Sequence, residues 1–103
     1  MLTFRYEADG AAIILTFTGK LDSVAVSGIT EMMDSEPLMQ NRADGHRIVF
    51  DLHEVDYVSS AFIRVCISSA RKAGKGNFSI TNCQPFVKKT FKISGLDEIL
   101  QIT

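Results

Sequence analysis

Residues 48–65 place a buried-strand pattern directly before two serines and an amphipathic helix, and this order constrains the fold more than any other part of the chain. Residues 48–52 are predicted to form a strand, residues 56–58 follow a short link, and Ser59 and Ser60 stand where the helix begins. A serine hydroxyl in the first turn of a helix can cap free backbone N–H groups. If that serine carries a phosphate, the same N–H groups and the helix dipole accommodate the anion. The residues alone leave both roles open.

The composition predicts a single domain over residues 1–103. Hydrophobic residues make up 46% of the chain, which is enough for a core. The net charge is −1, from 11 basic and 12 acidic residues, and this balance argues against a nucleic-acid-binding protein. No stretch has the length of a membrane span, and the N-terminus has no signal-peptide pattern. We therefore expect a cytoplasmic protein without direct membrane insertion, unless it was cut from a longer chain.

The cysteine and histidine residues form no metal-ligand motif. Cys66 and Cys83 lie 17 residues apart without a CxxC spacing, and we expect them to be small core residues in a reducing compartment. His46 and His53 flank the central strand and belong to no zinc pattern. The chain also has no Gly-rich phosphate loop before a helix. We therefore expect no metal and no cofactor.

The hydrophobic periodicity predicts strands and helices in the order β-β-α-β-α-β-α. The first two strands form a hairpin around Asp9-Gly10, and residues 19–22 end the second strand. Asp22 or Ser23 then caps a helix that Pro37 ends or kinks. The strands are expected at residues 2–7, 11–18, 46–52 and 77–81, and the later helices at 60–73 and about 85–94. Such alternation predicts an α/β fold, with a mixed β-sheet opened by a β-hairpin and covered by three to four helices.

Four short motifs in this order resemble the STAS domain, the fold of bacterial anti-sigma factor antagonists. The likeness covers nearly the whole chain. The motifs are Gly19-Lys20-Leu21-Asp22, the run from Asp51 to Ala61, Ala73-Gly74-Lys75-Gly76, and Ser94-Gly95-Leu96-Asp97-Glu98-Ile99. Each motif is weak alone, and their shared order on the predicted elements makes the resemblance specific.

The resemblance implies a phosphorylated serine in the loop before the second helix. The family's common Asp-Ser-Ser-Gly sequence falls here on Ser59, Ser60, Ala61 and Phe62, so Ser60 takes the phosphorylated position. Ser59 is the expected N-cap and the less favoured phosphorylation site. Phe62 replaces a glycine, and it either fills a core edge or offers a hydrophobic contact to a partner.

The expected partner-binding residues surround this serine. On a helical wheel four residues of the helix lie towards its outer side, namely Ala61, Arg64, Val65 and Ser68. Asp22, if it lies beside the serines as in the family, would repel a phosphate there; otherwise it is only a helix cap. The expected partner-binding set is therefore Asp22, Ser59, Ser60, Ala61, Phe62, Arg64 and Val65.

Three function hypotheses follow. The resemblance implies a protein-binding module that engages an anti-sigma factor with serine kinase activity, is switched off by phosphorylation of Ser60, and is reset by a serine phosphatase. The alternative is a STAS scaffold without a phosphate cycle, such as a subunit holding the ATPase of an ABC-type lipid transport complex. The third, an enzyme, is disfavoured because no nucleophile elbow or acid–base pair accompanies Ser60. The role of the loop from Asn41 to Gly45 and the choice between a monomer and a weak dimer stay open.

Overall fold

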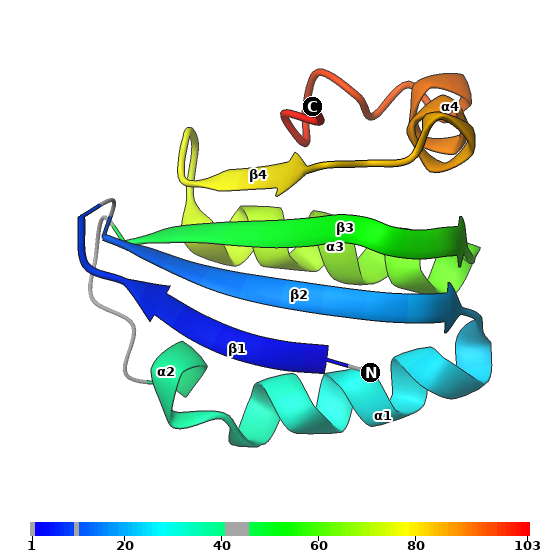
Figure 1. Ribbon diagram of the computed structural model, residues 1–103. Coiled ribbons are helices and arrows are strands. Elements are labelled where there is room, and N and C mark those ends of the chain that lie inside the picture. Colours follow the sequence, from blue (N-terminus) through cyan, green and yellow to red (C-terminus); the bar gives the residue numbers. More distant parts are fainter. Residues whose placement is uncertain (1, 10, 41–45) are drawn as a thin grey trace.

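The first two strands form the predicted antiparallel hairpin at one edge of a four-stranded sheet (Figure 1). The computed structural model describes residues 2–9, 11–40 and 46–103. β1 (Leu2–Glu7) pairs with β2 (Ala12–Leu21) from Leu2 opposite Phe17 to Glu7 opposite Ala12. The second strand ends at Leu21, within residues 19–22 as predicted, but it runs three residues beyond the expected range of 11–18. Gly10 of the predicted turn lies outside the described residues.

The other two strands extend the sheet by parallel pairing. β3 (Arg47–Val58) pairs with β2, and β4 (Phe78–Thr81) pairs with β3, giving the spatial order β1-β2-β3-β4. Parallel neighbours require crossover connections, which helices supply here. The result is the predicted mixed α/β fold with β3 as a central strand.

Four helices make these connections and end the domain. α1 (Ser23–Ser35) and the one-turn α2 (Pro37–Gln40) connect β2 to β3, and α3 (Ser60–Ala73) connects β3 to β4. Pro37 separates α1 from α2, as predicted. The loop from Asn41 to Gly45, whose role was left open, lies outside the described residues. Within the described part of the chain, no helix is long and apolar enough to cross a membrane.

Aromatic side chains at the junction of β2, β3 and α3 form the centre of the core. The rings of Phe17, Phe50 and Phe62 are fully buried. Phe62 from α3 lies with its ring centroid 5.1 Å from that of Phe17 and 6.0 Å from that of Phe50. Phe50 also packs edge-on against Phe78 of β4 at 4.9 Å. Because α3 inserts Phe62 between two strands, its first turn is held at a fixed position relative to the sheet.

β3 is one continuous strand, so the predicted link before residues 56–58 is wrong. Its pairing with β2 shifts twice. From Asp51 to Glu54, β3 advances by three residues while β2 advances by two, and from Val55 to Tyr57, β3 advances by two residues while β2 advances by one. Each shift adds one residue to β3, as in a β-bulge. The extra residues keep Val55 and Val58 buried, while Glu54 and Tyr57 stay exposed.

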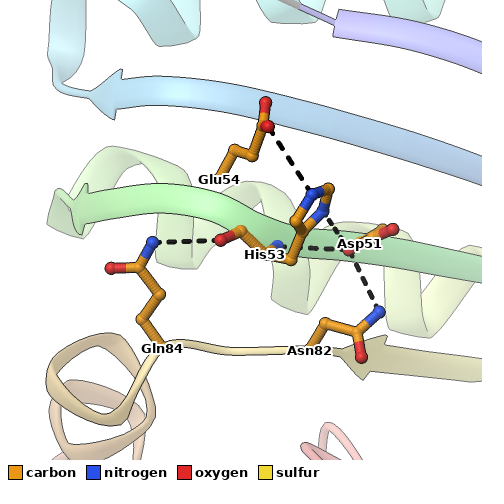
Figure 2. A network of polar contacts seen from close by, with 5 residues as sticks. All are labelled: Asp51, His53, Glu54, Asn82 and Gln84. Atoms are coloured by element: carbon orange, nitrogen blue, oxygen red, sulfur yellow. Dashed lines mark hydrogen bonds and ion pairs between the residues drawn. The ribbon is translucent and has the colours of Figure 1, made fainter.

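Side chains satisfy the backbone groups that the first bulge displaces (Figure 2). The N–H of His53 donates to Asp51 Oδ1 at 3.1 Å, and its carbonyl accepts from Gln84 Nε2 at 3.0 Å. Asn82 Nδ2 donates to the same Asp51 oxygen at 3.3 Å. β4 is too short to pair with this part of β3, and the segment leading into α4 (Pro85–Ile93) contacts it instead. The second half of β3 is therefore held by β2 on one side and by Asn82 and Gln84 on the other.

The C-terminal segment covers the outer edge of β4. Ile102 forms a parallel bridge to Ile80, and the N–H of Thr103 donates to the Ile80 carbonyl at 2.9 Å. A turn follows α4, and beyond it the chain contributes this single bridge to the sheet. In α1, Val26 and Ile29 are buried and form its apolar stripe, whereas Met32 is exposed.

Candidate functional site

Two helices begin side by side at the carboxyl edge of β2 and β3. Leu21 is opposite Val58 in the parallel pair, and the next residues, Asp22 and Ser59, are the N-caps of α1 and α3. The N–H of Ser59 donates to the Leu21 carbonyl at 3.0 Å and joins the two loops. The positive ends of two helix dipoles thus lie at one edge of the sheet.

Each cap residue uses its side chain to satisfy a backbone donor of its own helix. Asp22 Oδ1 accepts from the N–H of Ala25 at 2.9 Å, and Ser59 Oγ accepts from the N–H of Phe62 at 3.3 Å. Both side chains are partly buried. The prediction that Ser59 is the N-cap is therefore confirmed, and Asp22 is the cap of α1. Asp22 also lies beside the serines, so its carboxylate adds negative charge to this edge.

Ser60 is the first residue of α3 and differs from Ser59 in its exposure and in its hydrogen bonding. It is exposed, and its hydroxyl makes no hydrogen bond within the described part of the chain. An unengaged, exposed hydroxyl can be reached by an enzyme without any change in the fold. A charge placed on it would lie next to the N-terminal end of α3, which favours anions.

Most of the other predicted contact residues lie on the same surface. Ala61 and Val65 are partly buried, and Arg64 is exposed one turn after Ser60. Arg64 forms no ion pair or hydrogen bond with another described residue. These residues and the two caps form what we call the switch surface, which consists of Asp22, Ser59, Ser60, Ala61, Arg64 and Val65.

Phe62 must be removed from the predicted partner-binding set. Its side chain is 0% exposed and packs between Phe17 and Phe50. The helical wheel places it on the apolar side of α3, and the structure places it at the centre of the core rather than at the core edge. A partner cannot reach this ring, so Phe62 does not obstruct the switch surface.

Sequence reasoning missed three residues near this edge. Val24, in the first turn of α1, is 82% exposed. On the helix it lies opposite the apolar stripe of Val26 and Ile29. The helical spacing alone therefore indicated that Val24 faces outward. Lys20 and Tyr57 are partners across the β2–β3 pair, with the Lys20 ammonium 5.4 Å from the Tyr57 ring centre. Their pairing depends on the register shifts, which the sequence does not reveal.

No general base accompanies the serines in the described part of the chain. Both ring nitrogens of His53 face carboxylates, at 3.3 Å from Asp51 Oδ1 and 3.6 Å from Glu54 Oε1 (Figure 2). The hydroxyl of Ser60 has no hydrogen-bonded base among the described residues, although a nucleophilic serine requires one. Nor do those residues contain three or more His, Cys, Asp or Glu side chains grouped to hold a metal ion.

Both cysteines are free thiols, and burial raises the pKa of each. Cys66 is buried in the core, and burial raises the pKa of its thiol well above the ordinary value of 9.0. Burial also raises the pKa of Cys83 to about 11, partly opposed by the nearby Lys88 ammonium. Cys66 is the core residue that the sequence predicted, whereas Cys83 is only partly buried and packs against the outside of the core.

Comparison with known proteins gives the same fold. A Bordetella bronchiseptica protein, BtrV, named as an anti-sigma factor antagonist, is 31% identical over 84 residues, which are 80% of this chain and 72% of BtrV. An anti-sigma-factor antagonist STAS protein from Planctomyces limnophilus superposes with a TM-score of 0.81 at 15% identity, covering 99% of this chain and 87% of that one. The anti-sigma factor antagonist SpoIIAA in its unphosphorylated form superposes with a TM-score of 0.75 at 18% identity, covering 100% and 88%.

The phosphorylated form of Bacillus SpoIIAA also has this fold, with a TM-score of 0.68 at 17% identity and coverage of 100% of this chain and 91% of that one. The family model for the STAS domain matches residues 4–103. This match extends from β1 to the C-terminal segment and includes the edge at which α1 and α3 begin. The chain therefore belongs to the STAS domain family.

Proposed function

We propose that this protein is an anti-sigma factor antagonist whose unmodified switch surface binds an anti-sigma factor with serine kinase activity. In this proposal the kinase uses ATP to phosphorylate Ser60 in the cytoplasm, the complex then dissociates, and a serine phosphatase restores binding. The observation that carries the proposal is the exposed and unengaged hydroxyl of Ser60 at the start of α3, next to Asp22. The name of BtrV and the existence of a phosphorylated SpoIIAA support it.

A phosphate on Ser60 should leave the folded domain stable but should weaken the interface with a partner that covers Ser60. A phosphate adds about −1.5 to −2 charges at pH 7. At a helix N-terminus this charge is stabilised by about 0.3–1 kcal/mol, up to about 2 in partly buried geometries. Against a partner, the same charge lies beside the Asp22 carboxylate and must lose water. An unpaired charge in an interface costs about 2–5 kcal/mol, enough to weaken binding by about 30-fold or more.

The burial of Phe62 weakens the alternative of a scaffold without a phosphate cycle. That alternative gained support from a bulky residue at the position of the family's glycine, where it would obstruct or redirect a docking kinase. Because the Phe62 side chain is 0% exposed, it obstructs nothing on the switch surface.

The proposal is tested with a purified anti-sigma serine kinase from the same organism, ATP and mass spectrometry. We expect one phosphate, on Ser60, and none in Ser60→Ala. Ser59→Ala is the matched control: it removes the neighbouring hydroxyl and should still be phosphorylated, although losing the cap costs about 1 kcal/mol of stability. Ser60→Asp should fold normally and lose kinase binding. A kinase that binds tightly, leaves Ser60 unmodified and binds Ser60→Asp equally well would refute the proposal.

A further inference from the structure

A cleft of about 420 Å³ lies between α1, α2 and α3 and joins the switch surface. Its apolar lining comes from four side chains that belong to different elements, namely Met33, Met39, Ile48 and Val65. Met33, Met39 and Val65 are only partly buried, so their outer parts meet solvent. Exposed apolar atoms in a concave site favour an apolar group from another molecule.

One wall of the cleft carries two cations that pair with no side chain in the described part of the chain. Arg64, Ser68 and Lys72 line it from α3 at intervals of four residues, and all three are exposed. No ion pair or hydrogen bond engages the side chains of Arg64 and Lys72 within the described residues. Asp34 is the acidic residue on the opposite wall. Among the described lining residues, two unpaired cations face one carboxylate, and this balance favours an occupant that brings its own acidic groups.

The position of the cleft relates it to the phosphorylation site. Arg64 follows Ser60 by four residues, which is about 6 Å along a helix, and Lys72 lies about 12 Å further on. Arg64 and Val65 belong both to the switch surface and to the cleft. A protein that covers Ser60 therefore reaches the first part of the cleft with the same surface.

We propose that this cleft is a second contact for the anti-sigma partner and receives a segment in which an apolar side chain is flanked by carboxylates. The inference rests on the proposed function, because the occupant is the protein that also covers Ser60. The apolar side chain enters the cleft, and the carboxylates pair with Arg64 and Lys72. Asp34 repels acidic groups from the α1 side and so sets the orientation of the segment.

Two variants test the cleft by different means, with the purified kinase as the binding partner. Arg64→Glu with Lys72→Glu reverses both cations, and Ser68→Trp fills the cleft from an exposed position without removing core atoms. The matched control is Arg71→Glu with Lys75→Glu, because it changes the net charge equally but concerns an exposed arginine and lysine outside the cleft. Circular dichroism and thermal unfolding establish that each variant is folded.

We expect the dissociation constant to rise at least about tenfold for both cleft variants and less than about threefold for the control, since each lost charge pair contributes on the order of 1 kcal/mol and reversal adds repulsion. The charge-reversal effect should shrink as salt is raised from 0.1 to 1 M, as expected when the Debye length falls from about 10 to 3 Å.

The possible results separate the two proposals. If Ser60→Asp loses binding while both cleft variants bind as the unchanged protein does, the cleft inference is wrong and the proposed function stands. If the cleft variants lose binding and Ser60→Asp does not, the cleft is a contact and the phosphate switch is wrong. Equal losses in the cleft and control pairs would show only a general charge effect and would overturn the inference, as would a kinase that does not bind the unchanged protein.

Discussion

Replacing Phe62 by alanine should destabilise the domain severely, although the motif that this segment resembles has a glycine at that position. The side chain is 0% exposed, and its ring packs against Phe17 at 5.1 Å and Phe50 at 6.0 Å. Truncating a buried phenylalanine to alanine costs about 3–5 kcal/mol, from lost burial and from the cavity that remains. Typical domains have only about 5–15 kcal/mol of total stability.

Urea denaturation at pH 7, followed by far-UV circular dichroism, measures this loss. We expect a lower midpoint with an unchanged slope, because the surface exposed on unfolding stays nearly the same. A loss of 3 kcal/mol corresponds to a fall in melting temperature of roughly 12–24 °C for a domain of this size. Val24→Ala is the control, since Val24 is 82% exposed, and it should change the unfolding free energy by less than about 0.5 kcal/mol.

A loss below about 1.5 kcal/mol for Phe62→Ala would contradict the placement of this ring in the core. It would also restore the possibility that Phe62 faces a partner. The same variant should not be used to probe binding, because partial unfolding would mimic loss of an interface.

Four further outcomes follow from helix caps, backbone conformation and burial. Asp22→Ala removes the cap that accepts from the N–H of Ala25 and should lower the free energy of unfolding by about 1 kcal/mol, measured in urea. Gly28→Ala should raise the same quantity by about 0.5–1 kcal/mol, because the glycine is helical and a Cβ there would meet no atom within 4 Å. A thiol reagent at pH 8 should leave Cys66 unmodified and label Cys83 slowly, until urea exposes both. The pKa of Cys83 is raised from 9.0 to about 11, so the folded state favours the protonated thiol. The stability that this preference contributes is complete below pH 9 and should be lost between pH 9 and 11. Measuring the free energy of unfolding against pH, with Cys83→Ser as the comparison, tests this.

The bounds of α3 could be predicted from the sequence because local signals agree there. Ser59 supplies a cap, Phe62 and Cys66 start an apolar stripe at helical spacing, and Gly74 follows the last residue. The second half of β3 could not be predicted in the same way. Its buried residues, Leu52, Val55 and Val58, are three apart rather than two, because each bulge adds a residue. Only pairing with β2 makes this spacing compatible with a strand.

Part of the candidate site could likewise be predicted from local sequence, and part depends on contacts between distant residues. The serine at the start of a helix could be predicted from the residues alone, whereas the position of Asp22 beside it depends on the parallel pairing of Leu21 with Val58, some 37 residues apart. The family resemblance supplied that neighbourhood in advance. The cleft beside Arg64 could not be predicted, because it exists only where α1, α2 and α3 meet.

The side-by-side start of α1 and α3 has a consequence for how such domains diversify. The hydrogen bond from Ser59 to Leu21 and the two caps fix this edge from within, and backbone N–H groups supply its preference for anions. None of this depends on outward-facing side chains such as Val24 and Arg64. Those side chains could therefore be exchanged in a duplicated copy without loss of the backbone geometry around Ser60.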